Sequence, residues 1–94
     1  GHVYAFVNIA WPGWVKIGMS ADWERRLASY QTYSPHANYK PLKVAGRISD
    51  RHHAEKRAHV LAEKTAAKRS GEWFRITDRD AKEVLRRIET ETKS

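Results

Sequence analysis

The chain has 94 residues, which allows one compact domain around one core and leaves no room for a second. Its 40% hydrophobic and 31% charged residues are typical of a globular rather than a disordered domain, and the absence of cysteine excludes disulfides and thiolate metal sites. A surplus of 18 Lys and Arg over 11 Asp and Glu gives a net charge of +7, which favours a polyanionic partner such as nucleic acid; no apolar run is long enough to span a membrane.

Almost the whole chain is expected to form a single domain, from residue 3 to residue 90. Gly1 and His2 have the character of a remnant left by tag removal, so neither is given a functional role. Residues 91–94 are polar and are expected to fray at the end of the last helix.

The first predicted elements are the two strands of an antiparallel hairpin. The segments 3–7 and 14–18 are rich in β-branched and aromatic residues, and the turn sequence Trp11-Pro12-Gly13 lies between them. Because side chains alternate along a strand, one face carries Val3, Ala5, Val7, Val15 and Ile17. The opposite face carries Tyr4, Phe6, Trp14 and Lys16. A half-solvated sheet face is the commoner use of such a second set.

A helix is predicted next, over residues 23–30, with Ser20 or Asp22 as its N-cap. Its inward stripe consists of Trp23, Leu27 and Tyr30. Arg25 is expected to point to solvent, whereas Arg26 lies at the edge of the stripe. An arginine in that position indicates an acidic partner, an aromatic ring or a phosphate.

A polar stretch over 32–41 contains two prolines and predicts a loop, after which residues 41–48 predict a third strand. Ser49 or Asp50 then caps a second helix, in which Glu55 flanks the apolar stripe and His52 and His59 lie beyond it. The stripe itself consists of Ala54, Ala58, Leu61, Ala62, Thr65 and Ala66.

The end of the chain predicts a short strand or turn over 72–76 and a last helix that opens with a capping box formed by Thr77 and Asp80. The apolar stripe of that helix consists of Ala81, Val84, Leu85 and Ile88. The order is thus β-β-α-β-α, a short strand or turn, and α. It predicts an α+β fold with a small three-stranded antiparallel sheet flanked by helices.

The chain carries the four residue types that a metal-dependent phosphodiesterase needs, and three of the four come from elements whose side chains can converge. Such an enzyme needs a base for water, cations around the scissile phosphate and a carboxylate that holds a divalent ion. Tyr4 is a candidate base if neighbouring cations or metal-bound water lower its pKa. Lys16 and Arg26 are candidate cations, and Glu55 is a candidate metal ligand.

Several short motifs, in a fixed order over residues 3–76, resemble the GIY-YIG nuclease superfamily. Those in the first half of the chain are Val3-Tyr4, Asn8, Lys16-Ile17-Gly18 and Arg26. Those in the second half are Glu55-Lys56-Arg57-Ala58-His59 and Gly71-Glu72-Trp73-Phe74. The second half resembles a phage-type branch of the superfamily, whose members carry the K-I-G and G-E-W-F motifs.

The resemblance implies a role for each of four residues. Tyr4 matches the tyrosine that serves as general base or positions the water, and Lys16 stands where the second motif has its tyrosine. Arg26 matches the helix arginine that contacts the scissile phosphate. Glu55 matches the glutamate that binds a single Mg²⁺ or Mn²⁺, most of whose other ligands are waters and phosphate oxygens.

Two departures from the superfamily pattern accompany the resemblance. The first glycine of the first motif is not present, and the asparagine that many members carry in the last short strand has no counterpart near Phe74. Tyr30 occupies a position that holds a histidine in some members, and His59 lies one turn from Glu55, so both are supporting groups beside the predicted site. Glu72 is either a surface acid or a partner of Arg26, and Trp73 and Phe74 are read as core.

The function expected from these features is a metal-dependent DNA endonuclease or nickase that hydrolyses phosphodiester bonds with one Mg²⁺ or Mn²⁺ ion. DNA is the expected partner, with RNA open as an alternative, and the expected location is the cytoplasm, of a bacterial host cell if a phage encodes the chain. Sequence preference is expected to be weak, since binding would run mainly through phosphates. Further predicted DNA contacts are Arg25, Lys43, Arg47, Arg51 and Lys56.

Three alternatives stay open at this point. The first is a DNA-binding module on the same fold with weak or no catalysis. The second is a zinc-like site on one face of the second helix, made by His52, Glu55 and His59, although a third well-placed ligand is not fixed. The third is a domain that binds acidic protein partners.

Overall fold

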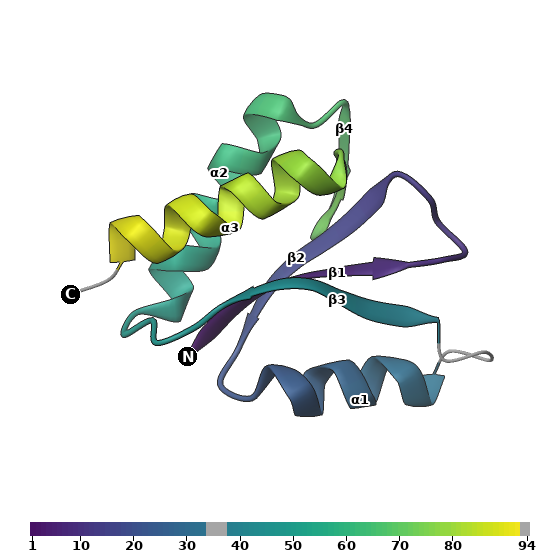
Figure 1. Ribbon diagram of the computed structural model, residues 1–94, viewed down its shortest axis with the longest axis horizontal. Helices are drawn as coiled ribbons and strands as arrows, with labels where there is room; N and C mark the ends of the chain where they lie inside the picture. The colour runs from purple at the N-terminus through teal and green to yellow at the C-terminus, as the bar shows by residue number, and fades with distance from the viewer. Residues whose placement is uncertain (34–37, 93–94) are drawn as a thin grey trace.

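The computed structural model describes residues 1–33 and 38–92 (Figure 1). Five strands and three helices follow one another along this part of the chain. In chain order they are β1 (His2–Asn8), β2 (Trp14–Ser20), α1 (Trp23–Tyr33), β3 (Tyr39–Ala45), α2 (Arg51–Thr65), β4 (Lys68–Ser70), β5 (Trp73–Arg75) and α3 (Asp78–Thr92).

All five strands form one antiparallel sheet in the order β3-β1-β2-β5-β4. The α+β class is confirmed, but the predicted three-stranded sheet is wrong. The segment predicted as a short strand or turn over 72–76 contains β5, whereas β4, with three exposed residues, was not predicted. Pairing with the hairpin, rather than any local pattern, makes them strands.

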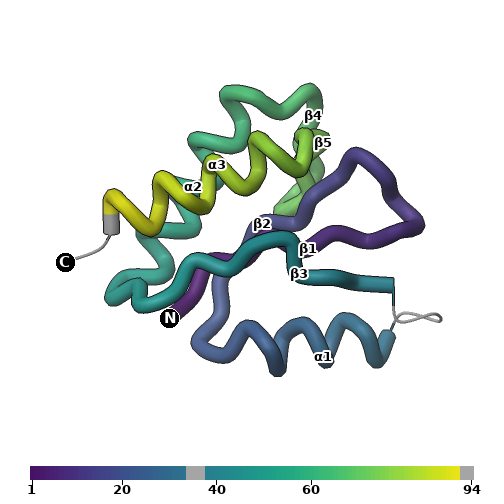
Figure 2. The backbone as a smooth tube through the Cα atoms, in the orientation of Figure 1, coloured from purple at the N-terminus to yellow at the C-terminus, as the bar shows by residue number. Residues whose placement is uncertain are grey.

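The sheet separates two unequal helical layers. Helices α2 and α3 lie together on one face and α1 lies alone on the other (Figures 1 and 2). The main core fills the space under α2 and α3, where the predicted inward face of the hairpin meets the apolar sides of both helices. Its largest fully buried members include Val3, Val15, Ile17, Phe74, Leu85 and Ile88.

The face under α1 is buried by aromatic rings rather than left half-solvated. Helix α1 has no fully buried residue, yet it covers Tyr4 and Phe6, which are 1% and 0% exposed. Phe6 stacks on Tyr4 with ring centroids 4.0 Å apart and meets Tyr30 edge-on at 6.1 Å. Large rings therefore bury this face with a single, half-buried helix above it.

The helix caps lie where the sequence predicts them. The carboxylate of Asp50 accepts a hydrogen bond from the backbone N–H of His53 at 3.1 Å, at the start of α2. Thr77 accepts from the N–H of Asp80 at 3.1 Å before α3. At the start of α1, Asp22 accepts from the N–H of Arg25 at 3.1 Å. Each bond satisfies a donor that the first turn of a helix leaves free.

Several element boundaries differ from the predicted ones. Helix α1 continues to Tyr33, and β3 covers 39–45 rather than 41–48, with a bulge in its pairing with β1. Residues 34–37 of the predicted loop lie outside the described residues. Helix α3 continues through residue 92 where fraying is predicted from 91, and 93–94 lie outside the described part. Thr65 is exposed at the end of α2, off the predicted stripe.

The first two residues take part in the sheet. Strand β1 begins at His2, which pairs with Ser20 of β2. The amino group of Gly1 donates a hydrogen bond to the carbonyl oxygen of Ile48 at 2.9 Å, and the N–H of Ile48 donates to the carbonyl oxygen of Gly1 at 3.1 Å. Whatever their origin, these residues tie the start of β1 to the segment that leads into α2.

No helix within 1–33 and 38–92 combines the length and the apolar character that crossing a membrane requires.

Gly18 faces the phenol of Tyr4 across the β1–β2 ladder. The two residues are paired, and a Cβ placed on Gly18 would lie 2.5 Å from the Tyr4 hydroxyl oxygen and 2.7 Å from its Cζ. Only a residue without a side chain leaves room for the ring at this position. The glycine of the K-I-G motif is therefore explained by this close approach.

Replacing Gly18 with alanine is expected to destabilise the fold by about 1–3 kcal/mol, because the ring of Tyr4 or the β2 backbone must shift. Urea unfolding checks this: the midpoint urea concentration should fall while the slope of the unfolding free energy against urea stays constant. Gly46→Ala is the matched control, since its Cβ would lie 3.4 Å from the nearest atom of His2, an ordinary contact. Equal stability of the two variants would contradict the steric account.

Candidate active site

One edge of β2 is open at its second half. Strand β5 pairs with β2 only over Trp14–Lys16, and the last contact across this edge is the hydrogen bond from the N–H of Ile17 to the carbonyl oxygen of Glu72 at 2.9 Å. Beyond it, no described strand pairs with Gly18 on that side. Side chains from both faces of the sheet can meet around this edge.

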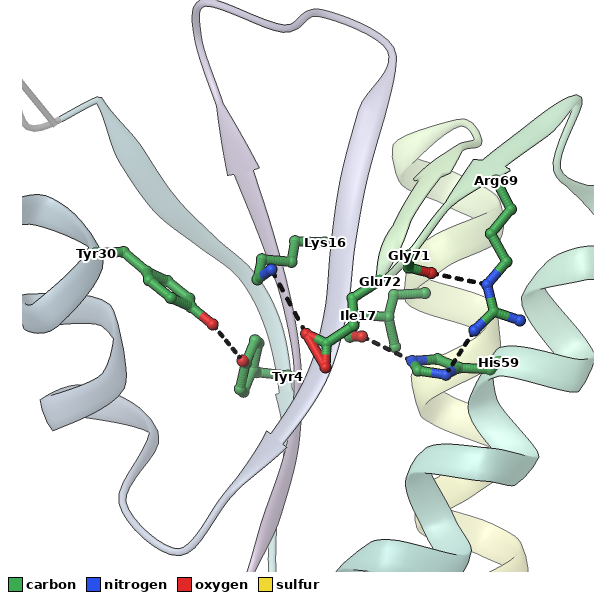
Figure 3. Close-up of polar contacts among 8 residues, drawn as sticks. All are labelled: Tyr4, Lys16, Ile17, Tyr30, His59, Arg69, Gly71 and Glu72. Carbon is green, nitrogen blue, oxygen red and sulfur yellow. Dashed lines mark hydrogen bonds and ion pairs between the residues drawn. The ribbon is translucent and has the colours of Figure 1, made fainter. Parts of the chain in front are cut away.

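Tyr4 reaches the edge from beneath α1. Its hydroxyl lies 3.0 Å from that of Tyr30, so one phenol donates a hydrogen bond to the other (Figure 3). Burial raises the pKa of Tyr4 well above its ordinary value, and the hydrogen bond to Tyr30 and the charge of Glu72 raise it further, while Arg26 acts in the opposite direction. Arg26 alone therefore does not bring the pKa of Tyr4 below its ordinary value, and the role of Tyr4 as a base stays a prediction.

Lys16 lies beside Tyr4 on the same face, as the alternation predicts. Its ammonium group is 3.5 Å from the carboxylate of Glu72 (Figure 3) and sits over two rings, 5.3 Å from the centroid of Tyr30 and 5.5 Å from that of Trp73. The side chain is only 17% exposed. The carboxylate and the two aromatic faces hold this cation in a defined position.

Glu55 approaches the same edge from α2, on the other side of the sheet. Burial raises its pKa, and the neighbouring carboxylate of Glu72 raises it further; the electrostatic effect of the His59 ring and hydrogen bonding from the backbone of Met19 act in the opposite direction. The carboxylate of Glu72 thus makes ionisation of Glu55 more costly, and the two side chains together form a site of concentrated negative charge. Such a site favours a cation.

His59 supports this edge through both ring nitrogens. Its Nε2 is 2.8 Å from the carbonyl oxygen of Ile17, which can only accept, so Nε2 carries the proton (Figure 3). Its Nδ1 then accepts a hydrogen bond from the guanidinium of Arg69 at 3.2 Å. With both nitrogens engaged, His59 fixes α2 against β2 and offers no spare lone pair for the zinc-like site considered above.

Arg26 and the other predicted basic contacts are placed differently. Arg26 is exposed on α1, close enough to lower the pKa of Tyr4, and Arg25 is exposed beside it. Lys56 is exposed next to Glu55 on α2. Arg47 and Arg51 lie in and after the β3–α2 connection, with Arg47 at a left-handed φ of 58°.

Lys43 lies apart from this group. It pairs across the sheet with Ala5, on the face covered by α3, and its ammonium group is 3.3 Å from the carboxylate of Glu89. The sheet therefore separates Lys43 from Tyr4 and Lys16.

Glu72 is the residue that sequence reasoning undervalued. The turn between β4 and β5 places it between Lys16 and Glu55, and it acts electrostatically on Tyr4 as well. Its partner is Lys16 rather than the Arg26 considered above. The G-E-W-F motif contained the signal, but only the pairing of β5 with β2 shows where the carboxylate goes.

The residues at the edge fit a single, largely hydrated divalent ion. No cluster of three or more His, Asp or Glu side chains suited to a metal occurs among the described residues. The carboxylates of Glu55 and Glu72 are oxygen donors of the kind that Mg²⁺ and Mn²⁺ prefer, and their mutual repulsion falls when a cation binds. Such an ion would take most of its ligands from water and substrate.

The raised pKa of Glu55 gives a stability prediction. The folded protein binds this proton more tightly than the unfolded chain, so stability falls as pH rises from the ordinary value of 4.5 through the folded pKa. Glu55→Gln, without metal, is expected to be more stable than the parent at pH 7, with a difference that shrinks toward pH 4. Thermal unfolding with a chelator checks this, and a difference that grows on acidification would contradict it.

Comparison with known proteins assigns the chain to a family. No curated protein sequence and no solved structure matches it significantly. One family model, the T5orf172 domain, matches residues 1–89, which is nearly the whole chain and includes every residue of the edge described above. The chain therefore belongs to the T5orf172 domain family.

Proposed function

We propose that this domain is a metal-dependent DNA endonuclease or nickase of the GIY-YIG type. The observation that carries the proposal is the convergence of a phenol, a lysine and two carboxylates at one open strand edge, on a chain with a net charge of +7. Membership of the T5orf172 family supports it, since this family suggests a nuclease-like or DNA-binding function.

The scissile phosphate is assigned to the cations on the α1 side of the edge. Lys16 is held over Tyr30 and Trp73 with its ammonium group beside Glu72, and Arg26 lies exposed nearby. Two cations from different elements bracket a phosphate and stabilise the charge that develops on its oxygens. Because the ion pair of Lys16 is already formed, little reorganisation is needed when the phosphate arrives.

Glu55 and Glu72 would hold the divalent ion at the same edge. When bound, such an ion neutralises charge on the phosphate and on the leaving oxygen. The role of the protein is to present the two carboxylates together: the backbone of Met19 hydrogen-bonds Glu55, and His59 fixes α2 against β2. Glu72 links the two halves of the site, since it contacts the lysine as well as the second carboxylate.

Tyr4 is assigned to the attacking water. As a neutral phenol with a raised pKa, it positions the water by hydrogen bonding, with Tyr30 fixing the direction of its hydroxyl. Loss of its proton requires more positive charge than Arg26 supplies alone. A cation at Glu55 and Glu72 would cancel the charge of Glu72 that raises the pKa of Tyr4, so it moves Tyr4 toward the role of base.

Glu55→Gln is expected to reduce plasmid nicking in Mg²⁺ or Mn²⁺ by about a hundredfold or more, because it removes a charged ligand from the ion. DNA binding in chelator should be retained. Gel electrophoresis of supercoiled plasmid gives the first quantity and fluorescence anisotropy the second. Glu83→Gln is the matched control, since Glu83 is exposed on α3 and forms an ion pair with its neighbour Arg86.

Parent protein that fails to nick plasmid, bulged DNA or branched DNA above the Glu55→Gln background would contradict the proposal. Equal activity in chelator and in Mg²⁺ would contradict the role of the ion.

A DNA-binding module with weak catalysis is the second candidate, and the raised pKa of Tyr4 favours it. Without a lowered pKa on Tyr4, chemistry can be slow while phosphate binding persists. Under this function the parent and Glu55→Gln bind DNA with the same salt dependence, and neither cleaves it.

Arg26→Ala is expected to flatten the plot of log Kd against log salt by about one unit for duplex DNA, because one phosphate contact is lost. Anisotropy titrations across a salt series measure the slope. Lys82→Ala removes an equal charge from an exposed position on α3, which lies on the opposite side of the sheet, and should leave the slope unchanged. Equal slopes for the two variants would contradict a phosphate contact at Arg26.

A further inference from the structure

The sheet face that carries Lys16 extends onto β5 and β4, where α1 does not cover it. One row of paired residues runs from Trp14 to Arg75 and on to Lys68. Two residues further along each strand, a second row runs from Lys16 to Trp73 and on to Ser70. Because directly paired residues point to the same face, all of these side chains lie on the side of Tyr4 and Lys16. We call this surface, with Trp11 from the β1–β2 turn, the tryptophan face.

A hollow opens in the tryptophan face. It is lined by Trp11, Trp14, Trp73 and Ser70 and measures about 230 Å³. That is below the size of about 300 Å³ at which pockets for drug-sized ligands begin, so the hollow suits one planar ring system. Trp11 and Trp73 meet edge-to-face with centroids 5.4 Å apart, and Trp11 is 50% exposed. Aromatic faces are therefore left uncovered.

Trp73 was predicted to be a core residue, and that prediction is wrong. It is half-buried, whereas its neighbour Phe74 points to the opposite face and is fully buried. The ammonium group of Lys16 lies over the ring of Trp73, 5.5 Å from the ring centroid. The hollow is thus directly continuous with the cation assigned to the scissile phosphate.

The charges around the hollow select its occupant. Lys68 and Arg75 are exposed on the tryptophan face, and neither forms an ion pair with any residue in 1–33 or 38–92. Free cations beside aromatic rings complement a ligand that alternates flat rings with negative charges. A nucleic-acid strand has that pattern, because each base that stacks on a ring is joined to a phosphate.

We propose that this hollow binds an unpaired nucleobase of the strand whose phosphate lies at Lys16, with Trp11 and Trp73 as its stacking partners. The inference rests on the proposed function for the position of that phosphate. It defines the substrate class as a strand with an unpaired nucleotide beside the cleavage site (a bulge, a flap or a single strand) in preference to continuous duplex. A base inside a duplex is already stacked on its neighbours and does not reach the hollow.

The test compares two ligands in chelator: a DNA duplex with one bulged nucleotide, and the same duplex with an abasic bulge. Fluorescence anisotropy is expected to show that the parent protein binds the bulged base about tenfold more tightly than the abasic bulge. Trp11→Ala should bind the two equally, and Trp11→Phe should restore most of the difference, because it restores an aromatic face. Matching ligands in RNA show whether the sugar matters.

Ile9→Ala is the matched control. Ile9 is exposed by 71% near the same turn and lies outside the hollow, so this variant should keep the full difference between the two bulges. A parent protein that binds both bulges equally would overturn the proposal. A second result would also overturn it: a loss of affinity in Trp11→Ala that is the same for the bulged base, the abasic bulge and the continuous duplex. That pattern indicates general apolar contact or altered folding.

The two proposals fail separately. Selective binding of the bulged base without cleavage in Mg²⁺ would remove the nuclease function and leave the nucleobase site standing. Cleavage in Mg²⁺ with no difference between the bulges would do the reverse.

Discussion

The phenol of Tyr4 lies against the backbone of Gly18, at a distance that no side chain on residue 18 would allow. This one close approach places the Tyr4 hydroxyl at the edge of β2 and within 3.0 Å of Tyr30 on α1. It also joins the aromatic layer under α1 to the strand that carries Lys16. The packing of α1 on the sheet and the position of the Tyr4 hydroxyl therefore both depend on this contact.

A second constraint is the shortness of β5. Because it pairs with β2 over three residues, the edge of β2 is open beyond Lys16, and a helix from the opposite face can bring Glu55 to it. A longer β5 would close the edge and separate Glu55 from Tyr4 by a continuous sheet. The hydrogen bond from Ile17 to Glu72 and that from His59 to Ile17 then fix both sides of the opening.

Charge is arranged around this opening in alternating signs. Glu72 lies between the ammonium group of Lys16 and the carboxylate of Glu55, so it stabilises the first and raises the pKa of the second. The negative pair attracts a cation, and the lysine attracts an anion. A metal ion and a phosphate are the two ligands whose charges fit this order, which is why a single site can be proposed for both.

Local patterns predicted those parts of the fold that depend on local chemistry. The hairpin faces, the three helix caps and the apolar side of α3 are each set by alternation, by a short polar side chain or by helical spacing, and all are confirmed. The segment 72–76 was open between a strand and a turn, and β4 is too short and too exposed to leave a pattern. The position of Glu72 and the half-exposed state of Trp73 follow from their pairing, so the sequence did not show them.

The central claim is that Glu55 and Glu72 hold one divalent ion next to Lys16. Anomalous diffraction from crystals grown with Mn²⁺ and a bulged DNA oligonucleotide tests it most directly. We expect one strong peak within coordination distance of the Glu55 carboxylate, with a phosphate oxygen between the peak and the ammonium group of Lys16. A structure with DNA bound and no peak at this edge, or with the peak at another cluster of side chains, would contradict it.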